Sequence, residues 1–445
     1  MHRKRTLLCF LFLFALKLPV GGQTLSIDLP DALARAKQYG SQVQSANIAA
    51  ALAREDRVQA KAATLPSLNA FNQFIYTEGN GTPSGVFVAN DGVHVYNEQA
   101  QVHEELLSFL RRGEVRLAAV NEAAAKARTD VAARGLQVTV VQDYYAIASA
   151  QRKEKNAQLN LSEARNFFDI TQKQEHGGEV PHSDVIKAQL QVQQREREQA
   201  DARLAVRKAK VALAVLMFPN LQLNYDIVDD AAKPAILPSF AEVTGQATAG
   251  SPDLRAARLN LSAANLGVSV ARHAYLPSLS LDFFYGIDAN QFAGTSYNVA
   301  AEQRSNLPNF QVNKRQNLGY AAQATLTIPI WTWGSINSKV KQASLKKSQA
   351  ALDLTVAQRQ LQADVASAYG EAETAFGQVE SLRSSADLSA ESLRLTLLRY
   401  QAGEATALEV VDAQVTASQG RGAYDDGLLR YRVALATLQS LTGTL

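Results

Sequence analysis

Few side chains in this 445-residue sequence have a type and spacing that could do chemistry. Six histidines are available as metal ligands, chiefly His94 with His103 and His176 with His182. Neither pair has the one-turn spacing that lets two imidazoles on a helix share a metal ion. Met217 is the only methionine after the first residue, so no thioether cluster is available for soft metals. We therefore expect no metal site and no cofactor.

Enzymatic motifs are also missing from the sequence. It contains no Gly-x-Ser-x-Gly, no His-Glu-x-x-His and no glycine-rich phosphate loop. The remaining residues of interest are acidic and hydroxyl groups. Glu409 and Asp412 lie three apart, on one face of a predicted helix. Ser183 and Asp184 follow a predicted turn, so the surrounding elements decide what all four can do.

The N-terminus has the pattern of a secretory signal peptide. Basic residues (2–5) precede an apolar run (6–16) and a small-residue end (17–22). We expect export, with cleavage near Gly22. The only cysteine, Cys9, lies in this segment, so the mature chain should have no disulfide, thiol chemistry or acyl anchor. Without the four basic residues of the signal, the formal net charge changes from +3 to −1, which leaves no basic surplus for nucleic acid.

The chain repeats itself at an offset of about 210 to 225 residues. Leu-Pro-Ser-Leu at 65–68 recurs at 276–279, and Gly178 recurs as Gly403. The offset grows slowly in one direction, as expected of a duplicated unit with small insertions, whereas chance matches would scatter. We predict a signal peptide at 1–22, a first repeat at 23–220, a linker at 221–238 and a second repeat at 239–445.

Strand pairs are predicted at corresponding places in the two halves. In the second half, Leu279, Leu281 and Phe283 alternate with polar or small residues. A period of two with one apolar face is typical of a strand that faces lipid or a core. The first half has a weaker pattern, so the register of its strands stays open. The four strands are expected at about 66–77, 93–109, 277–288 and 317–330.

Long helices are predicted after each strand pair. The stretches 114–174 and 335–402 contain no proline. At about 1.5 Å per residue, each would be roughly 90–100 Å long, which exceeds an ordinary globular domain. Glycine-containing tips near 176–184 and near 400–409 would turn each helix back into a coiled-coil hairpin. Shorter helical stretches at 29–64 and 240–274 precede the strands.

The strands also limit how the chain could enter a membrane. No apolar run after the signal reaches the roughly 18–20 residues of a membrane-spanning helix. Entry into a bilayer would then require a closed β-barrel, because open sheet edges leave amides unpaired in hydrocarbon. Four strands are too few, since the smallest membrane barrels have about eight. Several copies of the chain would therefore share one barrel.

Four segments at the ends of these elements carry a family resemblance. They are the Leu-Pro-Ser-Leu strand starts, the junction at 326–334, the tip at 400–403 with Glu-Val-Val-Asp-Ala at 409–413, and the closing 440–445. In order and spacing, over essentially the whole mature chain, they resemble the TolC-like outer-membrane efflux proteins. The resemblance implies a mainly α fold with a transmembrane β part. Three copies of the duplicated unit of coiled-coil hairpins and strand pairs would form a 12-stranded β-barrel continued by an α-helical barrel.

The same resemblance implies a function. The chain would be a passive export duct, not an enzyme, located in the outer membrane and spanning the periplasm. It would be the outer-membrane channel subunit of a tripartite efflux pump or a type I secretion system. Its expected partners are two further copies, outer-membrane lipid, a periplasmic adaptor (membrane fusion) protein and an inner-membrane transporter. The cargo stays open among drugs, metals and polypeptides.

The resemblance further assigns a gate at the periplasmic end. In the family a network between helices holds the tunnel shut there, and Ser183, Asp184 and Tyr400 fall on matching positions. The family's arginine near the second tip is absent, because Ala405 takes its place. Ser183 and Asp184 have a simpler interpretation as helix-capping residues. Tyr400 has one as a buried packing residue.

The acidic pair and the tips receive roles in the same way. Glu409 and Asp412 match acidic family positions, so a trimer would ring its pore with carboxylates that favour cations. The alternative for this pair is an ordinary solvated helix face. The proposed adaptor contacts are the tip residues, whose glycines could also serve only a turn with positive φ. These residues are Gly178, Glu179, Val180, Pro181, Gly403, Glu404, Ala405 and Thr406.

One competing interpretation comes from another class of protein. A periplasmic coiled-coil adaptor or scaffold without a pore would share the long helices and the export signal. Such a protein would not need amphipathic strands at the end of each hairpin that lies far from its tip. The strands therefore decide between the two interpretations.

Overall fold

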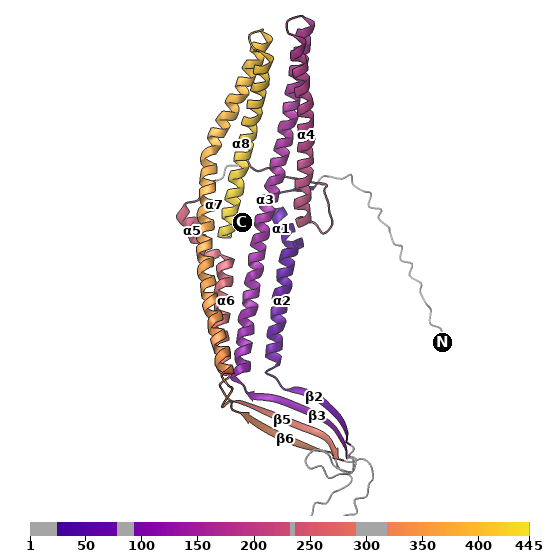
Figure 1. Ribbon diagram of the computed structural model, residues 1–445, viewed down its shortest axis with the longest axis vertical. Helices are drawn as coiled ribbons and strands as arrows, with labels where there is room; N and C mark the ends of the chain where they lie inside the picture. The colour runs from indigo at the N-terminus through magenta and orange to yellow at the C-terminus, as the bar shows by residue number, and fades with distance from the viewer. Residues whose placement is uncertain (1–24, 78–92, 232–235, 291–317, 445) are drawn as a thin grey trace, which may run out of the picture. The chain divides into compact units, whose positions relative to one another are not determined.

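The computed structural model describes residues 25–77, 93–231, 236–290 and 318–444 (Figure 1). The predicted signal peptide and four residues of the predicted linker, 232–235, lie outside the described residues. The chain divides into two compact units. Unit 1 takes the described residues of Met1–Ser41, Arg134–Val243 and Ala366–Leu445, and unit 2 those of Gln42–Ala133 and Thr244–Val365.

Helices make up most of both units (Figure 1). Helices α3 and α7 each contribute their first residues to unit 2 and the rest to unit 1. In chain order the elements are β1 (Leu25–Ile27), α1 (Leu29–Tyr39), α2 (Ser41–Ala62), β2 (Ser67–Thr77), β3 (Val93–Leu107), α3 (Phe109–His176), α4 (His182–Met217), β4 (Tyr225–Ile227), α5 (Phe240–Gly250), α6 (Pro252–His273), β5 (Ser278–Asn290), β6 (Leu318–Thr327), α7 (Ser335–Gln401) and α8 (Ala407–Thr442).

The predicted helical stretch of each half is divided into two helices, α1 with α2 and α5 with α6. Gly40 separates α1 from α2 with an extended backbone (φ −62°, ψ 117°). A Cβ there would lie 2.6 Å from Leu136, so the chain passes close to α3 at this point. In the second half Ser251 caps α6 by accepting a hydrogen bond from the Leu254 amide (3.3 Å), and Pro252 opens the helix. Both breaks follow local signals that a periodicity search passes over.

Unit 2 contains a four-stranded antiparallel sheet with the order β2-β3-β5-β6 (Figure 1). Its register pairs Leu68 with Val102, Val102 with Phe283 and Phe283 with Ala322. Because side chains alternate along each strand, these apolar residues share one face of the sheet. The register also answers the question that the polar first-half pattern left open, since Ser67 lies opposite His103.

The opposite face of the sheet is polar near its ends. His103 Nδ1 lies 2.6 Å from the Asp282 carboxylate, across the β3–β5 pair. Gly286 lies on β5 where the backbone of β3 comes close, because a Cβ there would lie 2.2 Å from the Glu98 carbonyl oxygen. The register of β3 against β5 shifts by one residue between Glu105 and Leu107, where the two strands end their pairing. A close backbone contact and an irregularity therefore help to define the register.

Unit 1 contains the two helical hairpins, α3 with α4 and α7 with α8 (Figure 1). Arg165 of α3 donates to Glu196 of α4 over 2.7 Å. On the second hairpin, Gly427 of α8 lets Leu382 of α7 approach closely, because an added Cβ would lie 2.4 Å from its Cδ1. The turns fall at 177–181 and 402–406, within the two predicted tip regions.

Part of the predicted linker, residues 225–231, packs within unit 1. Strand β4 pairs in parallel with β1, so that Ile227 lies beside Ile27. The Tyr144 hydroxyl donates to the Val228 carbonyl over 2.6 Å, and Arg432 donates to the Asp230 carbonyl over 2.8 Å. We call residues 225–231 the strap, because they fasten the connection between the halves onto α3 and α8.

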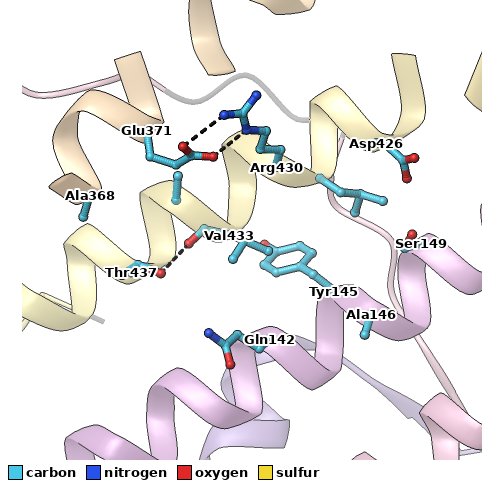
Figure 2. A pocket seen from close by; sticks show the side chains of 12 residues that line it. Gln142, Tyr145, Ala146, Ser149, Ala368, Glu371, Asp426, Arg430, Val433 and Thr437 are labelled. Carbon is cyan, nitrogen blue, oxygen red and sulfur yellow. Dashed lines mark hydrogen bonds and ion pairs between the residues drawn. The ribbon is translucent and has the colours of Figure 1, made fainter. Parts of the chain in front are cut away.

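A recess of about 420 Å³ lies among α3, α7 and α8 of unit 1 (Figure 2). Its lining is mainly small and apolar, with Tyr145 and Val433 among its walls. At its rim Arg430 makes two hydrogen bonds to Glu371 (Figure 2). This guanidinium lowers the pKa of the Glu371 carboxyl below its usual value. The recess is therefore an apolar gap between helices with an ion pair at its edge.

Within the described ranges, no helix has the length and apolar character needed to cross a membrane. No group of three or more His, Cys, Asp or Glu side chains gathers there as a metal site. Of the histidines singled out above, His182 lies 2.5 Å from Glu175 and His176 contacts its own helix at the Gln172 carbonyl.

Candidate functional site

Helices α3 and α8 are joined by a ladder of polar side chains. Arg421 makes two hydrogen bonds of 2.9 Å to Glu163 and a third, of 2.7 Å, to Asn160. Asp425 accepts hydrogen bonds from Arg152 (2.8 Å) and Asn156 (2.7 Å). The residues recur every three or four positions on each helix, which places them on facing sides. We call this set the α3–α8 ladder: Arg152, Asn156, Asn160, Glu163, Gln414, Ser418, Arg421 and Asp425.

The two tips are built in the same way. Gly178 and Gly403 adopt positive φ values of 77° and 78°. Each precedes a glutamate whose amide bonds back to the last turn of the helix, Glu179 to Gln174 and Glu404 to Arg399, both over 2.8 Å. A left-handed residue with such a returning bond is a standard helix end that favours glycine. The turn role of the glycines is thus established, whereas adaptor contact stays a prediction.

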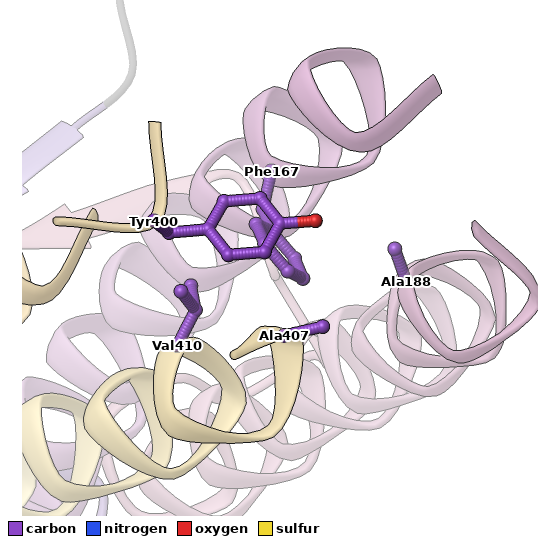
Figure 3. Close-up of a cluster of buried hydrophobic side chains, with 5 residues drawn as sticks. All are labelled: Phe167, Ala188, Tyr400, Ala407 and Val410. Carbon is purple, nitrogen blue, oxygen red and sulfur yellow. The ribbon is translucent and has the colours of Figure 1, made fainter. Parts of the chain in front are cut away.

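Tyr400 lies near the second tip in a buried cluster that joins the two hairpins (Figure 3). Only 3% of its surface is exposed, and its ring packs edge-on against Phe167 at 5.2 Å between centroids. Its hydroxyl donates to Thr171 of α3 over 3.3 Å. Burial raises the pKa of Tyr400, the hydrogen bond to Thr171 opposes this, and the charge of Asp184 adds to the increase. The cluster consists of Phe167, Ala188, Tyr400, Ala407 and Val410.

Ser183 and Asp184 lie in the first turn of α4. The residue at the N-cap is Pro181, and no side chain caps this helix end. The Asp184 carboxylate accepts a hydrogen bond from Lys187 over 3.0 Å, whereas Ser183 is exposed. Asp184 therefore raises the pKa of Tyr400 through its charge, while the hydrogen bond of its carboxylate goes to Lys187. Both gate roles stay predictions.

Ala405, at the position where the resemblance leads us to expect an arginine, is partly buried against the Tyr400 cluster. Val180 from the first tip also packs there, as do other partly buried apolar side chains. Ala405 thus extends an apolar contact between the two tips of this chain. An apolar contact of this kind does not depend on the ionic strength as an ion pair does.

Glu409 lies in the first turn of α8 and forms a capping box with Thr406. Its carboxylate accepts hydrogen bonds from the Thr406 amide and hydroxyl, both over 3.1 Å, and the Thr406 hydroxyl accepts from the Glu409 amide. These hydrogen bonds, with the charge of Arg399 at 3.6 Å, lower the pKa of the Glu409 carboxyl. Asp412 is exposed three residues further on. The two members of the predicted ring therefore have different surroundings.

Three contributors to these tips were not selected from the sequence. Phe167 and Thr171 are spaced as neighbours on one face of α3, but their partner Tyr400 lies 229 residues beyond Thr171. Arg399 precedes Tyr400 directly and reaches across the turn to the Glu404 carbonyl over 3.0 Å. Spacing along one helix can suggest a shared face, but only the packing of the hairpins shows which residue meets it.

The tip glycine gives a first testable prediction. Gly403→Ala should destabilise the chain by roughly 1–2 kcal/mol, because an L-residue is strained at this φ although nothing lies within 4 Å of the added Cβ. Gly377→Ala is the matched control, since this glycine is inside α7 and also has open space. It should stabilise by roughly 0.5–1 kcal/mol. Thermal unfolding of both variants measures the difference, and equal signs would contradict the turn role.

Comparison with known proteins identifies relatives over most of the chain. The sequence model of the outer membrane efflux protein family matches residues 32–217 and 243–444. Outer membrane protein OprJ of Pseudomonas aeruginosa is 25% identical over 315 residues, which are 70% of this chain and 62% of OprJ. The toluene efflux pump outer membrane protein TtgF of Pseudomonas putida is 27% identical over 330 residues, 72% of this chain and 63% of TtgF. The matches thus span less than two thirds of these relatives.

The fold has close counterparts among solved structures. The Campylobacter jejuni CmeC outer membrane channel superposes with a TM-score of 0.78 at 17% identity, over 94% of this chain and 85% of that one. This confirms the predicted fold class, a TolC-like arrangement of strand pairs and long helical hairpins. The two successive matches to one family model confirm the duplication. Since these matches cover well over half of the sequence, the chain belongs to the outer membrane efflux protein family.

Proposed function

We propose that the chain is the outer-membrane channel subunit of a tripartite efflux pump or a type I secretion system. Three copies form one passive duct, in which their four-stranded sheets close a 12-stranded β-barrel in the outer membrane. Their hairpins continue this barrel as an α-helical barrel across the periplasm. The duct carries out no catalysis of its own. An inner-membrane transporter supplies the energy, and a periplasmic adaptor connects the transporter with the duct.

The sheet of unit 2 is the observation that carries this proposal. Its order leaves β2 and β6 as edge strands within the described residues. Leu68 and Leu326 on its apolar face are 73% and 59% exposed. In water, an open edge and an apolar face promote aggregation. In a bilayer, the sheets of several copies pair edge to edge, which satisfies the hydrogen-bonding groups of the edge strands, and lipid covers the apolar face.

The same sheet argues against a periplasmic scaffold without a pore. A scaffold would need the hairpins only, and Leu68, Phe74, Tyr320 and Leu326 would then be exposed to water. Support for transport comes also from the relatives, because TtgF is named for toluene efflux. Whether this chain passes drugs, metals or polypeptides does not follow from that name.

The gate of this duct is proposed at the tips. The Tyr400 cluster, with Ser183 and Asp184 beside it, holds the periplasmic end closed. Support comes from the burial of Tyr400 between the two hairpins and from its hydrogen bond to Thr171. Ala405 supports an apolar closure, since it packs against this cluster where the family has an arginine.

The remaining tip residues are proposed as binding surfaces. Glu409 and Asp412 line the narrow end as an acidic ring, and both are exposed in the single chain. The turns at 178–181 and 403–406 are proposed to contact the adaptor. Support comes from the exposure of every residue in these turns except the partly buried Val180 and Ala405, and from the matching structure of the two turns, which offers an adaptor two similar sites per chain.

Purification in detergent tests this function directly. The mature chain should be extracted from the outer-membrane fraction only by detergent, and light scattering corrected for detergent should give a trimer. In a planar bilayer the trimer should open ion channels. A monodisperse monomer, or release of soluble protein by high salt, would contradict the shared barrel. A folded trimer that never conducts would contradict the duct.

A further inference from the structure

Arg399 is held beside the acidic end of α8. Its guanidinium donates to the Glu404 carbonyl over 3.0 Å, and its own carbonyl accepts the Glu404 amide over 2.8 Å. The second guanidinium nitrogen lies 3.6 Å from the Glu409 carboxylate. The turn of the second tip therefore fixes a positive charge next to one of the two predicted ring residues.

The carboxylates of Glu409 and Asp412 differ in whether a positive charge lies close to them. The Glu409 carboxylate is engaged by the Thr406 amide and hydroxyl and faces Arg399. The Asp412 carboxylate is exposed, and within the described residues it has no hydrogen-bond or ion-pair partner. The three groups together have a formal charge of −1 per chain, where the two acids alone would have −2.

We propose that Arg399 sets the charge of the narrow end of the duct by neutralising Glu409, so that Asp412 supplies the net negative charge there. This inference rests on the proposed function, because it needs a pore that the acidic pair faces. Any ion close enough to sense the Glu409 carboxylate also senses the guanidinium 3.6 Å from it. Arg399 is thus a selectivity-determining residue that lowers the cation preference of the ring.

The experiment compares reversal potentials of single channels under a KCl gradient. Low ionic strength is used, because salt screens charges over about 10 Å at 0.1 M. Arg399→Gln should raise the cation-to-anion permeability ratio by roughly two- to ten-fold, at or below the lower limit of about ten-fold by which a focusing charged cleft raises the local ion concentration. Asp412→Asn should lower the ratio. Arg399→Lys keeps the charge and should behave as wild type.

Two further variants make the comparison sharp. Arg399→Gln with Glu409→Gln restores the net charge and should return the ratio to wild type, while glutamine can still complete the capping box. Arg394→Gln is the matched control, because Arg394 lies on the same helix and pairs with Glu391 of its own turn over 2.8 Å. This control should leave the ratio unchanged. Trimer content of every variant is checked on a gel.

The outcomes distinguish a failure of the Arg399 role from a failure of the proposed function. If wild type conducts and Asp412→Asn lowers the ratio but Arg399→Gln matches wild type, the role of Arg399 is wrong and the duct stands. The same holds if the double variant keeps the ratio of Arg399→Gln. If wild type forms no channel, the proposed function fails and this inference fails with it.

Discussion

Tyr400→Ala is expected to raise the resting conductance of the channel severalfold. The substitution removes a ring that is 97% buried and packed on Phe167, which costs about 3–5 kcal/mol for a large core side chain. In a trimer the loss occurs three times at the narrow end. Tyr400→Phe should have a smaller effect, because it removes only the hydrogen bond to Thr171, worth roughly 0.5–1.5 kcal/mol. Single-channel recording in one bilayer preparation measures both.

Tyr431→Ala serves as the control for general damage. Tyr431 is also buried, at 6% exposure, but it packs with Ala375 and Leu435 in another cluster of unit 1. Its removal should lower the stability without opening the channel at rest. If Tyr400→Ala conducts like wild type, or if both variants open equally, then the Tyr400 cluster is ordinary packing and the gate lies elsewhere.

Arg421→Ala is the second change with a large expected effect, here on stability. Arg421 is the central cation of the α3–α8 ladder and satisfies both Glu163 and Asn160. Their ion pair is about one-fifth exposed, with side chains at 19% and 24%. We expect a loss of roughly 2–3 kcal/mol, less than the 3–5 kcal/mol for one partner of a fully buried pair. Thermal unfolding followed by helical circular dichroism measures it.

Two variants separate the ladder from an ordinary surface ion pair. Arg430→Ala removes a similar doubly bonded pair with Glu371, but both side chains are nearly half exposed, so water replaces the lost partner. Its effect should be clearly smaller. Arg421→Met with Glu163→Leu should recover part of the loss, because no unpaired charge is left between the helices. Equal losses for Arg421→Ala and Arg430→Ala would contradict a stabilising ladder.

Much of this fold could be predicted from the sequence because the patterns that indicate its helices and strands extend over many residues. Proline-free stretches gave α3 and α7, and the period of two gave β5 and β6. The glycines of the turns, Gly178 and Gly403, were identified by their recurrence and have the positive φ that a turn requires. Such features depend on local chemistry, so a single sequence records them.

Features that depend on distant contacts were not predictable. The segment around Gln99 and Gln101 is polar, and its register depends on the pairing of β3 with both β2 and β5. The strap was predicted as part of a plain linker because two prolines, Pro234 and Pro238, follow it in the sequence. Its order comes from a three-residue pairing with β1 and from hydrogen bonds to Tyr144 and Arg432, none of which has a local pattern.

In the candidate site, too, residue types at fixed positions could be predicted from the sequence, whereas contacts between distant segments could not. The resemblance identified Tyr400 and the missing arginine, because both are residue types at fixed positions near a tip. It did not give the partners of Tyr400 on α3, since these come from the other hairpin. It also did not show Arg399 beside Glu409, because that contact depends on how the side chain folds over the turn.

The interleaving of the two units affects the order in which the chain can fold. Unit 1 combines three separate stretches of sequence, and its last stretch includes the final helix, α8. A chain synthesised from its N-terminus presents β1 and the first hairpin long before α8 is made. Contacts of such high sequence separation form late, and the partly assembled intermediates expose apolar surface. Unit 1 therefore stays incomplete until its last helix has been made, and its two earlier stretches keep apolar surface uncovered until then.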